Sequence, residues 1–225
     1  MQYGTVIQGT FLSRPNRFIA HVSVGGTAVV CHVKNTGRCR ELLIPGAVVY
    51  LEQSDNPDRK TKYDLIAVEK KGILINMDAQ APNKVFAEWA GQFLPGLTAV
   101  RPEYTWEDSR FDFLLEDAAG PYLVEVKGVT LEEDGEVRFP DAPTERGVRH
   151  IKGLIRASEQ GIRTALFFVV QLKGAKRFRP NDAAHPVFGE TLRTAAAKGV
   201  GIFAYDCLVT PDSLQLDAPV PVMLT

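Results

Sequence analysis

Cysteine is scarce in this chain, and the three residues present are scattered. Cys31, Cys39 and Cys207 are odd in number, and no two of them form a Cys-x-x-Cys pair. A disulfide scaffold is therefore excluded, and Cys31, His32 and Cys39 would offer zinc only three ligands. This cysteine usage suits a reducing compartment, so we expect the protein to act in the cytoplasm.

Long apolar runs are also missing. The longest, residues 165–170, has the length of a strand, whereas a membrane helix needs about 18–20 apolar residues. The N-terminus has no charged segment followed by an apolar one, so neither a signal peptide nor a membrane partner is expected. Glycine-rich phosphate loops, dinucleotide fingerprints and Gly-x-Ser-x-Gly elbows are absent too, which excludes the enzyme classes that depend on them.

The sequence is long enough for two small domains, and its periodicity changes near residue 80. Its 225 residues are 45% hydrophobic and 24% charged, which is typical of a globular protein. Residues 1–80 contain six short apolar or alternating runs separated by turn residues, which predicts a small β-barrel or sandwich. The runs are 5–12, 18–24, 28–33, 47–53, 64–70 and 72–76.

Residues 81–225 alternate between helical and strand patterns. Helices are expected over 83–92, 144–160 and 187–198, and strands over 100–105, 110–116, 122–127, 163–171 and 200–205. The order α-β-β-β-α-β-α-β predicts a mixed sheet with helices packed on it, and an α/β (α+β overall) chain. Residues 1–80 have ten Lys and Arg against seven Asp and Glu, and residues 81–225 have sixteen against twenty. This difference in charge between the two segments could arise by chance, or it could reflect a basic module joined to an acidic one.

Two strands joined by a turn at residues 117–120 are expected to bring charged side chains together. With that loop, Asp112 faces Glu125, and directly opposed residues share one face of a sheet. Lys127, two residues beyond Glu125, lies on the same face. Apolar neighbours on both strands favour a cluster within the sheet over a solvated surface group, whereas a register slip of one residue would scatter it.

Two carboxylates this close repel each other unless a cation, a shared proton or solvent offsets their charge. Lys127 is one such cation. Mg²⁺ or Mn²⁺ held by Asp112 and Glu125 is another, because hard divalent metals prefer carboxylate and phosphate oxygens. Such a metal can activate water and hold a phosphodiester while Lys127 stabilises developing charge. The alternative is a surface cluster without chemistry.

Several motifs give the chain a specific family resemblance. They are Asn35-Thr36-Gly37, SDNPDRK at 54–60, SRFDFLL at 109–115, VEVKGVTL at 124–131, FPDA at 139–142, TERG at 144–147 and His150. The chain resembles the sugar fermentation stimulation protein family, with small departures at Pro143 and residues 31–34. An aspartate in one strand, Glu-x-Lys in the next and a preceding helix with a glutamate also resemble the PD-(D/E)XK nuclease fold.

The resemblance implies an OB-like β-barrel over residues 1–80 and a PD-(D/E)XK nuclease-like domain over residues 81–225. It implies that Glu88 joins Asp112, Glu125 and Lys127 in the site as the helical acid. It further implies DNA binding without sequence specificity, a bacterial or archaeal cytoplasm, and a link to sugar metabolism. The oligomeric state stays open, with a homodimer as one option.

Cations in or beside the turns of the first segment suit phosphate binding. The residues expected to contact DNA are Arg14, Arg17, Arg38, Arg40, Arg59 and Lys60. Secondary roles near the carboxylates are expected for Asp141, Thr144, Arg146, His150 and Gln171. The acidic stretch 132–136 is expected to be a solvated hairpin tip.

Three functions are compatible with these residues. The leading one is a non-specific DNA-binding protein whose metal site cleaves phosphodiester bonds. The second is a DNA-binding regulator of sugar metabolism without turnover. The third is an acid/base enzyme acting on a small molecule such as a sugar. It is disfavoured because Phe111, Phe113 and Tyr122 are expected on the opposite face from the carboxylates.

Overall fold

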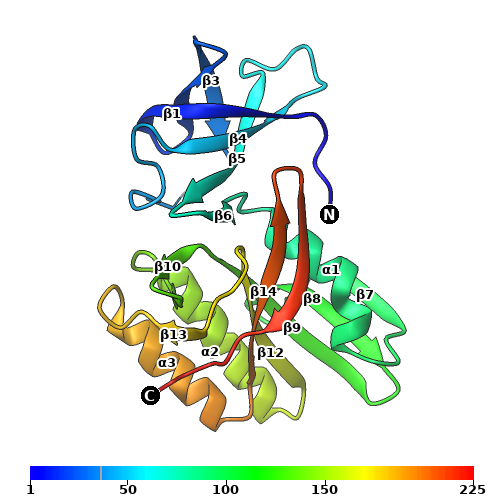
Figure 1. Cartoon of the computed structure of the whole chain (residues 1–225). Coiled ribbons are helices and arrows are strands. Elements are labelled where there is room, and N and C mark those ends of the chain that lie inside the picture. Colours follow the sequence, from blue (N-terminus) through cyan, green and yellow to red (C-terminus); the bar gives the residue numbers. More distant parts are fainter. Residues whose placement is uncertain (36) are drawn as a thin grey trace.

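The N-terminal strands close into a five-stranded barrel, drawn at the top of Figure 1. The computed structural model describes residues 1–35 and 37–225, so Thr36 of the Asn-Thr-Gly motif lies outside the described residues. The barrel strands are β1 (Val6–Asn16), β2 (Ile19–Val24), β3 (Thr27–Val33), β4 (Val48–Gln53) and β5 (Tyr63–Lys70). β1 pairs with β2 and β4, and a parallel β3–β5 pairing closes the ring. The predicted barrel is confirmed.

Alternating side chains fill the barrel, as the strand period requires. Phe11, Val22, Val49 and Leu65 are almost fully buried in its interior. Cys31 is buried there as well and carries a free thiol. A short strand, β6 (Ile73–Asn76), extends the barrel along β5 and leads into the second half of the chain.

A mixed six-stranded sheet forms the second half. Its strand order is β15-β14-β12-β9-β8-β7, and β12 lies parallel to both of its neighbours. The strands are β7 (Ala99–Trp106), β8 (Ser109–Asp117), β9 (Gly120–Val129), β12 (Arg163–Val170), β14 (Gly201–Thr210) and β15 (Ser213–Pro219). The almost wholly apolar β12 is buried along its length, as predicted for a central strand.

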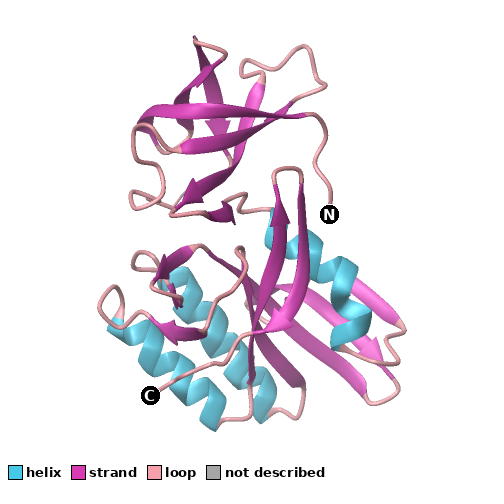
Figure 2. Ribbon diagram, in the orientation of Figure 1, coloured by secondary structure: helices cyan, strands magenta, loops and turns pink. Residues whose placement is uncertain are grey.

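Helices cover both faces of this sheet (Figure 2). α1 (Ala81–Phe93) packs on one face, where the Phe86 ring lies 5.2 Å from that of Phe113 and 4.8 Å from that of Phe167. α2 (Glu145–Glu159) and α3 (Pro186–Ala197) cover the other face. None of the helices in the described part of the chain is long and apolar enough to cross a membrane.

The acidic stretch after β9 forms a hairpin tip, as predicted, but it is only partly solvated. It forms the hairpin β10 (Leu131–Glu133) and β11 (Glu136–Phe139), which joins β13 (Arg177–Pro180) in a small third sheet. Glu132 is buried rather than solvated, because its carboxylate accepts from Gly135 N (2.7 Å) and pairs with Lys70 of the barrel (3.2 Å). The stretch therefore ties the barrel to the second half of the chain.

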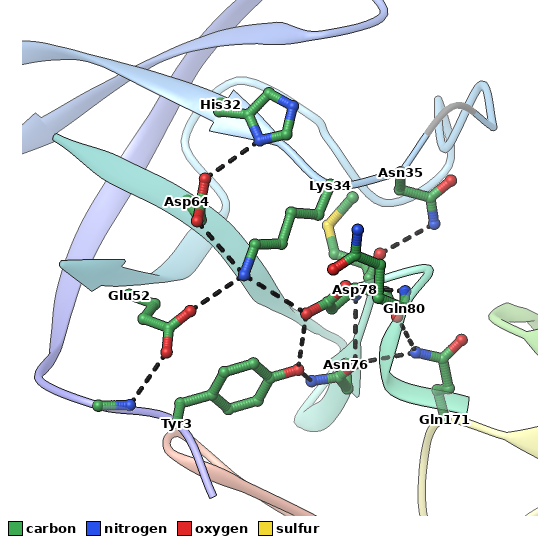
Figure 3. A network of polar contacts seen from close by, with 12 residues as sticks. Tyr3, His32, Lys34, Asn35, Glu52, Asp64, Asn76, Asp78, Gln80 and Gln171 are labelled. Carbon is green, nitrogen blue, oxygen red and sulfur yellow. Dashed lines mark hydrogen bonds and ion pairs between the residues drawn. The ribbon is translucent and has the colours of Figure 1, made fainter. Parts of the chain in front are cut away.

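A polar network spans the junction between the two halves (Figure 3). Lys34 lies at its centre, with its ammonium 3.1 Å from Glu52, 3.3 Å from Asp64 and 3.7 Å from Asp78. Gln171, at the end of β12, donates from Nε2 to Asn76 Oδ1 (2.8 Å) and to the Asp78 carbonyl (3.0 Å). The segment between β6 and α1 is thus hydrogen-bonded to both halves.

Asp64 is expected to make this network sensitive to acid. Its burial alone would raise its pKa, but hydrogen bonds from Arg59 and the Lys34 ammonium lower the pKa to about 2. A depressed pKa stabilises the fold above the unfolded-state value and loses that contribution as pH falls from about 4 to about 2. We expect Asp64→Asn to lower the free energy of unfolding by about 2 kcal/mol at neutral pH.

Urea unfolding of wild type and Asp64→Asn across this pH range checks the prediction. The difference between the two proteins should shrink as pH falls through the window. Asp58→Asn, an exposed position on the same barrel, is the control and should change little. A difference that stays constant with pH would contradict the electrostatic origin.

Candidate metal and DNA site

The β8–β9 hairpin has the predicted register. Phe113 pairs with Val124, Leu114 with Leu123 and Glu116 with Pro121. The turn is tighter than expected, because Asp117 and Gly120 are themselves paired. This register places Asp112 and Glu125 at the same level, one step beyond the last recorded pair. There the Asp112 carboxylate, rather than backbone, accepts the Val126 N–H (2.8 Å).

Asp112 is held on both carboxylate oxygens. Oδ2 accepts from Val126 N, and Oδ1 accepts from Nδ2 of Asn83 in the first turn of α1 (2.8 Å). Burial and the neighbouring charge of Glu125 nevertheless raise the pKa of Asp112, against the opposing effect of Lys127. The ionised form of Asp112 is therefore destabilised, as expected for one of two close, buried carboxylates.

Glu125 is 1% exposed and lies between two nitrogen groups. Its Oε1 contacts both the Lys127 ammonium and Nδ1 of His150 on α2. Burial would raise its pKa, but Lys127 and His150 outweigh burial and lower it. Oε2 is buried and has no hydrogen-bond partner among the described residues. A buried carboxylate oxygen without a partner is costly, so this atom is a candidate metal ligand.

The structure does not bring Glu88 to this cluster. Its carboxylate pairs with the amino group of Met1 (2.6 Å), and its side chain is more than half exposed. The sequence predicted a helix that begins at residue 83, but the N-cap is Gln80, and α1 begins at Ala81. Asn83 is therefore the third residue of the helix, in its first turn, and reaches Asp112, whereas Glu88 faces the N-terminus of the chain.

His150 is a closer partner of the carboxylates than its secondary ranking suggested. His150 lies on α2, which packs on one face of the sheet, and its imidazole contacts the Glu125 carboxylate of the inner strand β9. The pattern alone contained no signal for that contact. Arg146, one turn earlier, lies beside it, with Nε 3.4 Å from His150 Nε2.

The other secondary residues have structural contacts. Thr144 caps α2 by accepting from Gly147 N (3.1 Å). A Cβ at Gly37 would lie 2.7 Å from Asp141 Oδ2, so Asp141 packs against the barrel loop. Gln171 packs against the strand next to Lys127, since a Cβ at Gly128 would clash with Gln171 Oε1. Its amide nitrogen serves the junction network described above.

Four of the predicted DNA-contacting arginines line one hollow of about 650 Å³ on the barrel. We call it the arginine hollow; its arginines are Arg14, Arg17, Arg38 and Arg40. None of the described residues that line it is acidic. The side chains of Arg17, Arg38 and Arg40 are exposed.

Arg14 differs from the other three, because its guanidinium is used inside the protein. It donates to the carbonyls of Asn35, Gly37, Arg38 and Arg17 at 2.7–2.9 Å. Four carbonyl acceptors occupy the donors that a phosphate would need. Arg14 therefore organises the loop that carries Arg38 rather than facing solvent.

Arg59 and Lys60 lie outside the arginine hollow. Arg59 forms a bidentate ion pair with the buried Asp64 (2.6 and 2.8 Å), which neutralises its charge. Lys60 is exposed. Of the six cations predicted to contact DNA, the structure gathers three exposed arginines at one place.

The donor set of the carboxylate cluster suits a hard cation. In the described part of the chain, no group of three or more His, Cys, Asp and Glu side chains is arranged to hold a metal. Asp112 and Glu125 would thus supply two carboxylates and leave further positions to water or substrate oxygens. Magnesium sites commonly have this composition.

A closed OB barrel followed by a mixed sheet with an aspartate and a Glu-x-Lys on adjacent strands defines an OB and PD-(D/E)XK nuclease-like architecture. Two family models match the chain: "SfsA N-terminal OB domain" over residues 12–77 and "Sugar fermentation stimulation protein RE domain" over residues 80–213. The chain belongs to the sugar fermentation stimulation protein family.

Relatives match along the whole chain. The sugar fermentation stimulation protein homolog of Clostridium beijerinckii is 50% identical over 100% of both chains. That of Desulfitobacterium hafniense is 52% identical over 100% of this chain and 99% of its own. Among solved structures, SfsA of Pyrococcus furiosus in complex with Ca²⁺ has a TM-score of 0.89 at 28% identity, covering 99% of this chain and 98% of that one.

Proposed function

We propose that this protein binds DNA without sequence specificity and cleaves phosphodiester bonds at a divalent-metal site formed by Asp112 and Glu125. The observation that carries the proposal is Glu125 Oε2, a buried carboxylate oxygen without a partner in the described part of the chain, beside an aspartate whose pKa is raised. A cation between the two carboxylates would satisfy that oxygen and favour ionisation of Asp112.

Mg²⁺ or Mn²⁺ is the proposed cation. The relative from Pyrococcus furiosus was solved in complex with Ca²⁺, which shares with Mg²⁺ a preference for oxygen ligands. When bound, the cation would polarise a phosphoryl oxygen and lower the pKa of bound water. Asn83 and the Val126 amide orient Asp112, His150 holds Glu125, and Lys127 stabilises charge that develops on the phosphate.

The arginine hollow supports the DNA-binding half of the proposal. Three exposed arginines converge without an acidic residue among the described lining, on a barrel of the type that binds nucleic acid. Such contacts go to phosphates and carry no sequence information by themselves. The cytoplasm is the proposed setting, in keeping with three free thiols.

Replacing Arg17, Arg38 and Arg40 by alanine is expected to weaken DNA binding equally for unrelated sequences. Three lost phosphate contacts should make the log–log salt slope shallower by about 2.7 units on duplex DNA. Fluorescence anisotropy with labelled DNA at several salt concentrations measures this slope. The control is Lys71→Ala with Lys176→Ala, two exposed lysines that do not line the arginine hollow. Equal slopes for the triple variant and wild type would contradict the assignment.

A cleavage assay tests the catalytic half. Purified protein is incubated with single- and double-stranded DNA in Mg²⁺, Mn²⁺ or EDTA, with Glu125→Gln as the negative control. Metal-dependent cleavage that Glu125→Gln abolishes supports the proposal. DNA binding without cleavage under every metal condition would instead favour a regulator that only binds DNA.

The small-molecule alternative has less support. Phe113 and Tyr122 face α1, as expected, but Phe111 lies on the carboxylate side, where its ring centroid is 6.3 Å from that of His150. The expectation for Phe111 was therefore wrong. Phe111 is fully buried and cannot stack on a sugar, so the correction does not favour a sugar enzyme.

A further inference from the structure

A second cationic hollow lies on the nuclease-like half, beside the carboxylate site. Its volume is about 270 Å³, and we call it the α2 hollow. Its charged lining consists of Arg110, Arg146, Arg149, Lys152, Arg156 and Asp108, together with the imidazole of His150. Among the described residues that line it, five are therefore permanent cations and one is a carboxylate.

The carboxylate does not offset this excess. Asp108 is engaged by Arg156, which also contacts Glu107, so Arg156 and Asp108 neutralise each other. Arg110 approaches Glu103 only at 3.8 Å. Arg149 and Lys152 are exposed and have no ion-pair or hydrogen-bond partner within the described part of the chain. At least three cations, Arg146, Arg149 and Lys152, therefore share the α2 hollow without a counter-charge among the described residues.

The charges on this face of α2 are unlike those of an ordinary solvated helix face. Arg146, Arg149 and Lys152 follow one another at intervals of three, which places them on one side of α2. Exposed helix faces commonly alternate acidic and basic residues, and like charges at this spacing are destabilising. An unbalanced row of cations is stabilised when an anion binds along it.

His150 connects the α2 hollow to the metal site. Its Nδ1 contacts Glu125, while its ring lines the hollow, with Nε2 beside Arg146. One imidazole therefore separates the row of cations from the proposed metal ligand. An anion in the α2 hollow would lie next to the place where the chemistry is proposed to occur.

The dimensions match a nucleic acid strand better than a single small anion. From Arg146 to Lys152, the three cations without a counter-charge, the helix rises about 9 Å, at 1.5 Å per residue. A strand of duplex DNA carries one phosphate per roughly 3.4 Å of helix axis, so this length covers about three phosphates. A row of cations over that distance is suited to a polyanion.

We infer that the α2 hollow binds backbone phosphates of the DNA strand that enters the metal site. The inference rests on the proposed function and adds to it a second contact surface. The arginine hollow holds DNA on the barrel, and the α2 hollow positions the strand beside Asp112 and Glu125. DNA bound in the productive mode therefore contacts both halves of the chain.

Arg149→Ala combined with Lys152→Ala tests this inference. Both side chains are exposed, so the fold should be unaffected. Loss of two phosphate contacts should make the log–log salt slope shallower by about 1.8 units. Between roughly 50 and 200 mM salt, the variant's DNA affinity should therefore fall by a factor about ten times smaller than that of wild type. Mn²⁺ affinity should be unchanged, because neither residue contacts the carboxylates. The control is again Lys71→Ala with Lys176→Ala.

The outcomes separate the inference from the function beneath it. If the α2 variant keeps the wild-type slope while the Arg17, Arg38 and Arg40 variant does not, DNA lies on the barrel alone, and the inference is wrong while DNA binding stands. If wild type binds neither single- nor double-stranded DNA, the proposed function fails and the inference falls with it. The inference is supported if the salt slope of the α2 variant is shallower than that of wild type while the slope of the control is unchanged.

Discussion

Asp112→Asn is expected to abolish divalent-metal binding and, at the same time, to stabilise the metal-free protein. Loss of one of the two carboxylates proposed as ligands should weaken Mn²⁺ binding by about 100-fold or more, since even supporting residues around a metal typically contribute 10–100-fold. The stabilisation follows from the raised pKa of Asp112, which burial and the Glu125 charge produce. Asparagine removes that destabilising charge.

The local hydrogen bonds are compatible with the substitution. Asparagine at position 112 can still accept the Val126 N–H through its oxygen. Its amide nitrogen can donate to Asn83 once the Asn83 amide turns over, because asparagine offers both a donor and an acceptor. The shape of the side chain is unchanged, so the variant tests the charge rather than the packing.

The pH dependence gives the prediction a definite sign. A group whose pKa is raised in the folded state favours folding at low pH and loses that contribution as pH rises through the raised value. The stability advantage of Asp112→Asn over wild type should therefore be small at low pH and grow as Asp112 ionises. As pH is lowered, wild-type Mn²⁺ affinity should begin to fall at a higher pH than it would if Asp112 had the pKa of an ordinary aspartate.

Calorimetric titration with Mn²⁺ and thermal unfolding without metal measure the two effects. Asp134→Asn is a suitable control, since it removes an exposed carboxylate in a turn whose positive φ asparagine tolerates. It should change neither quantity appreciably. Metal binding that survives in both Asp112→Asn and Glu125→Gln would show that the cation lies elsewhere.

The part of this site that the sequence predicts is the part that local backbone rules determine. Strand alternation and the turn near Ala118 are enough to place Asp112 level with Glu125, and the observed pairing agrees. The barrel strands were predictable for the same reason, since short alternating runs between turn residues encode them directly.

The part that was not predictable depends on how helices pack on the sheet. Asn83 and Glu88 both lie on α1, and periodicity does not say which of them reaches the strand end. The contact of His150 with Glu125 likewise depends on the position of α2. Arg14 had the sequence appearance of its neighbours, yet the loop folds around its guanidinium.

The short strands were missed because their pairing is non-local. β11 pairs with β13, which lies almost forty residues further along the chain, and neither is longer than four residues. Burial of Glu132 depends on Lys70 of the barrel, and no window around an acidic run contains that information. These contacts are tertiary, so composition alone indicated a solvated tip.

Lys127→Met is expected to lower the rate constant for DNA cleavage by about 10²–10³-fold while leaving DNA affinity nearly unchanged. Removing one preorganised group that stabilises transition-state charge typically has an effect of this size. The Lys127 side chain is 19% exposed, so its charge acts in a partly water-excluded site, and methionine replaces its aliphatic stem closely. Lys127→Arg, which keeps the charge but not the geometry, should be intermediate.

Metal affinity provides a readout of the same variant that does not depend on turnover. The Lys127 ammonium contacts Glu125, and it helps to hold the pKa of that carboxyl down. A bound cation would have to share Glu125 with this positive charge, so its removal should tighten Mn²⁺ binding even as cleavage is lost. Tighter metal binding with slower cleavage would identify Lys127 as a catalytic residue rather than a structural one. If Lys127→Met weakened Mn²⁺ binding and cleavage to the same degree, Lys127 would instead act by maintaining the site, and its assignment to transition-state stabilisation would be wrong.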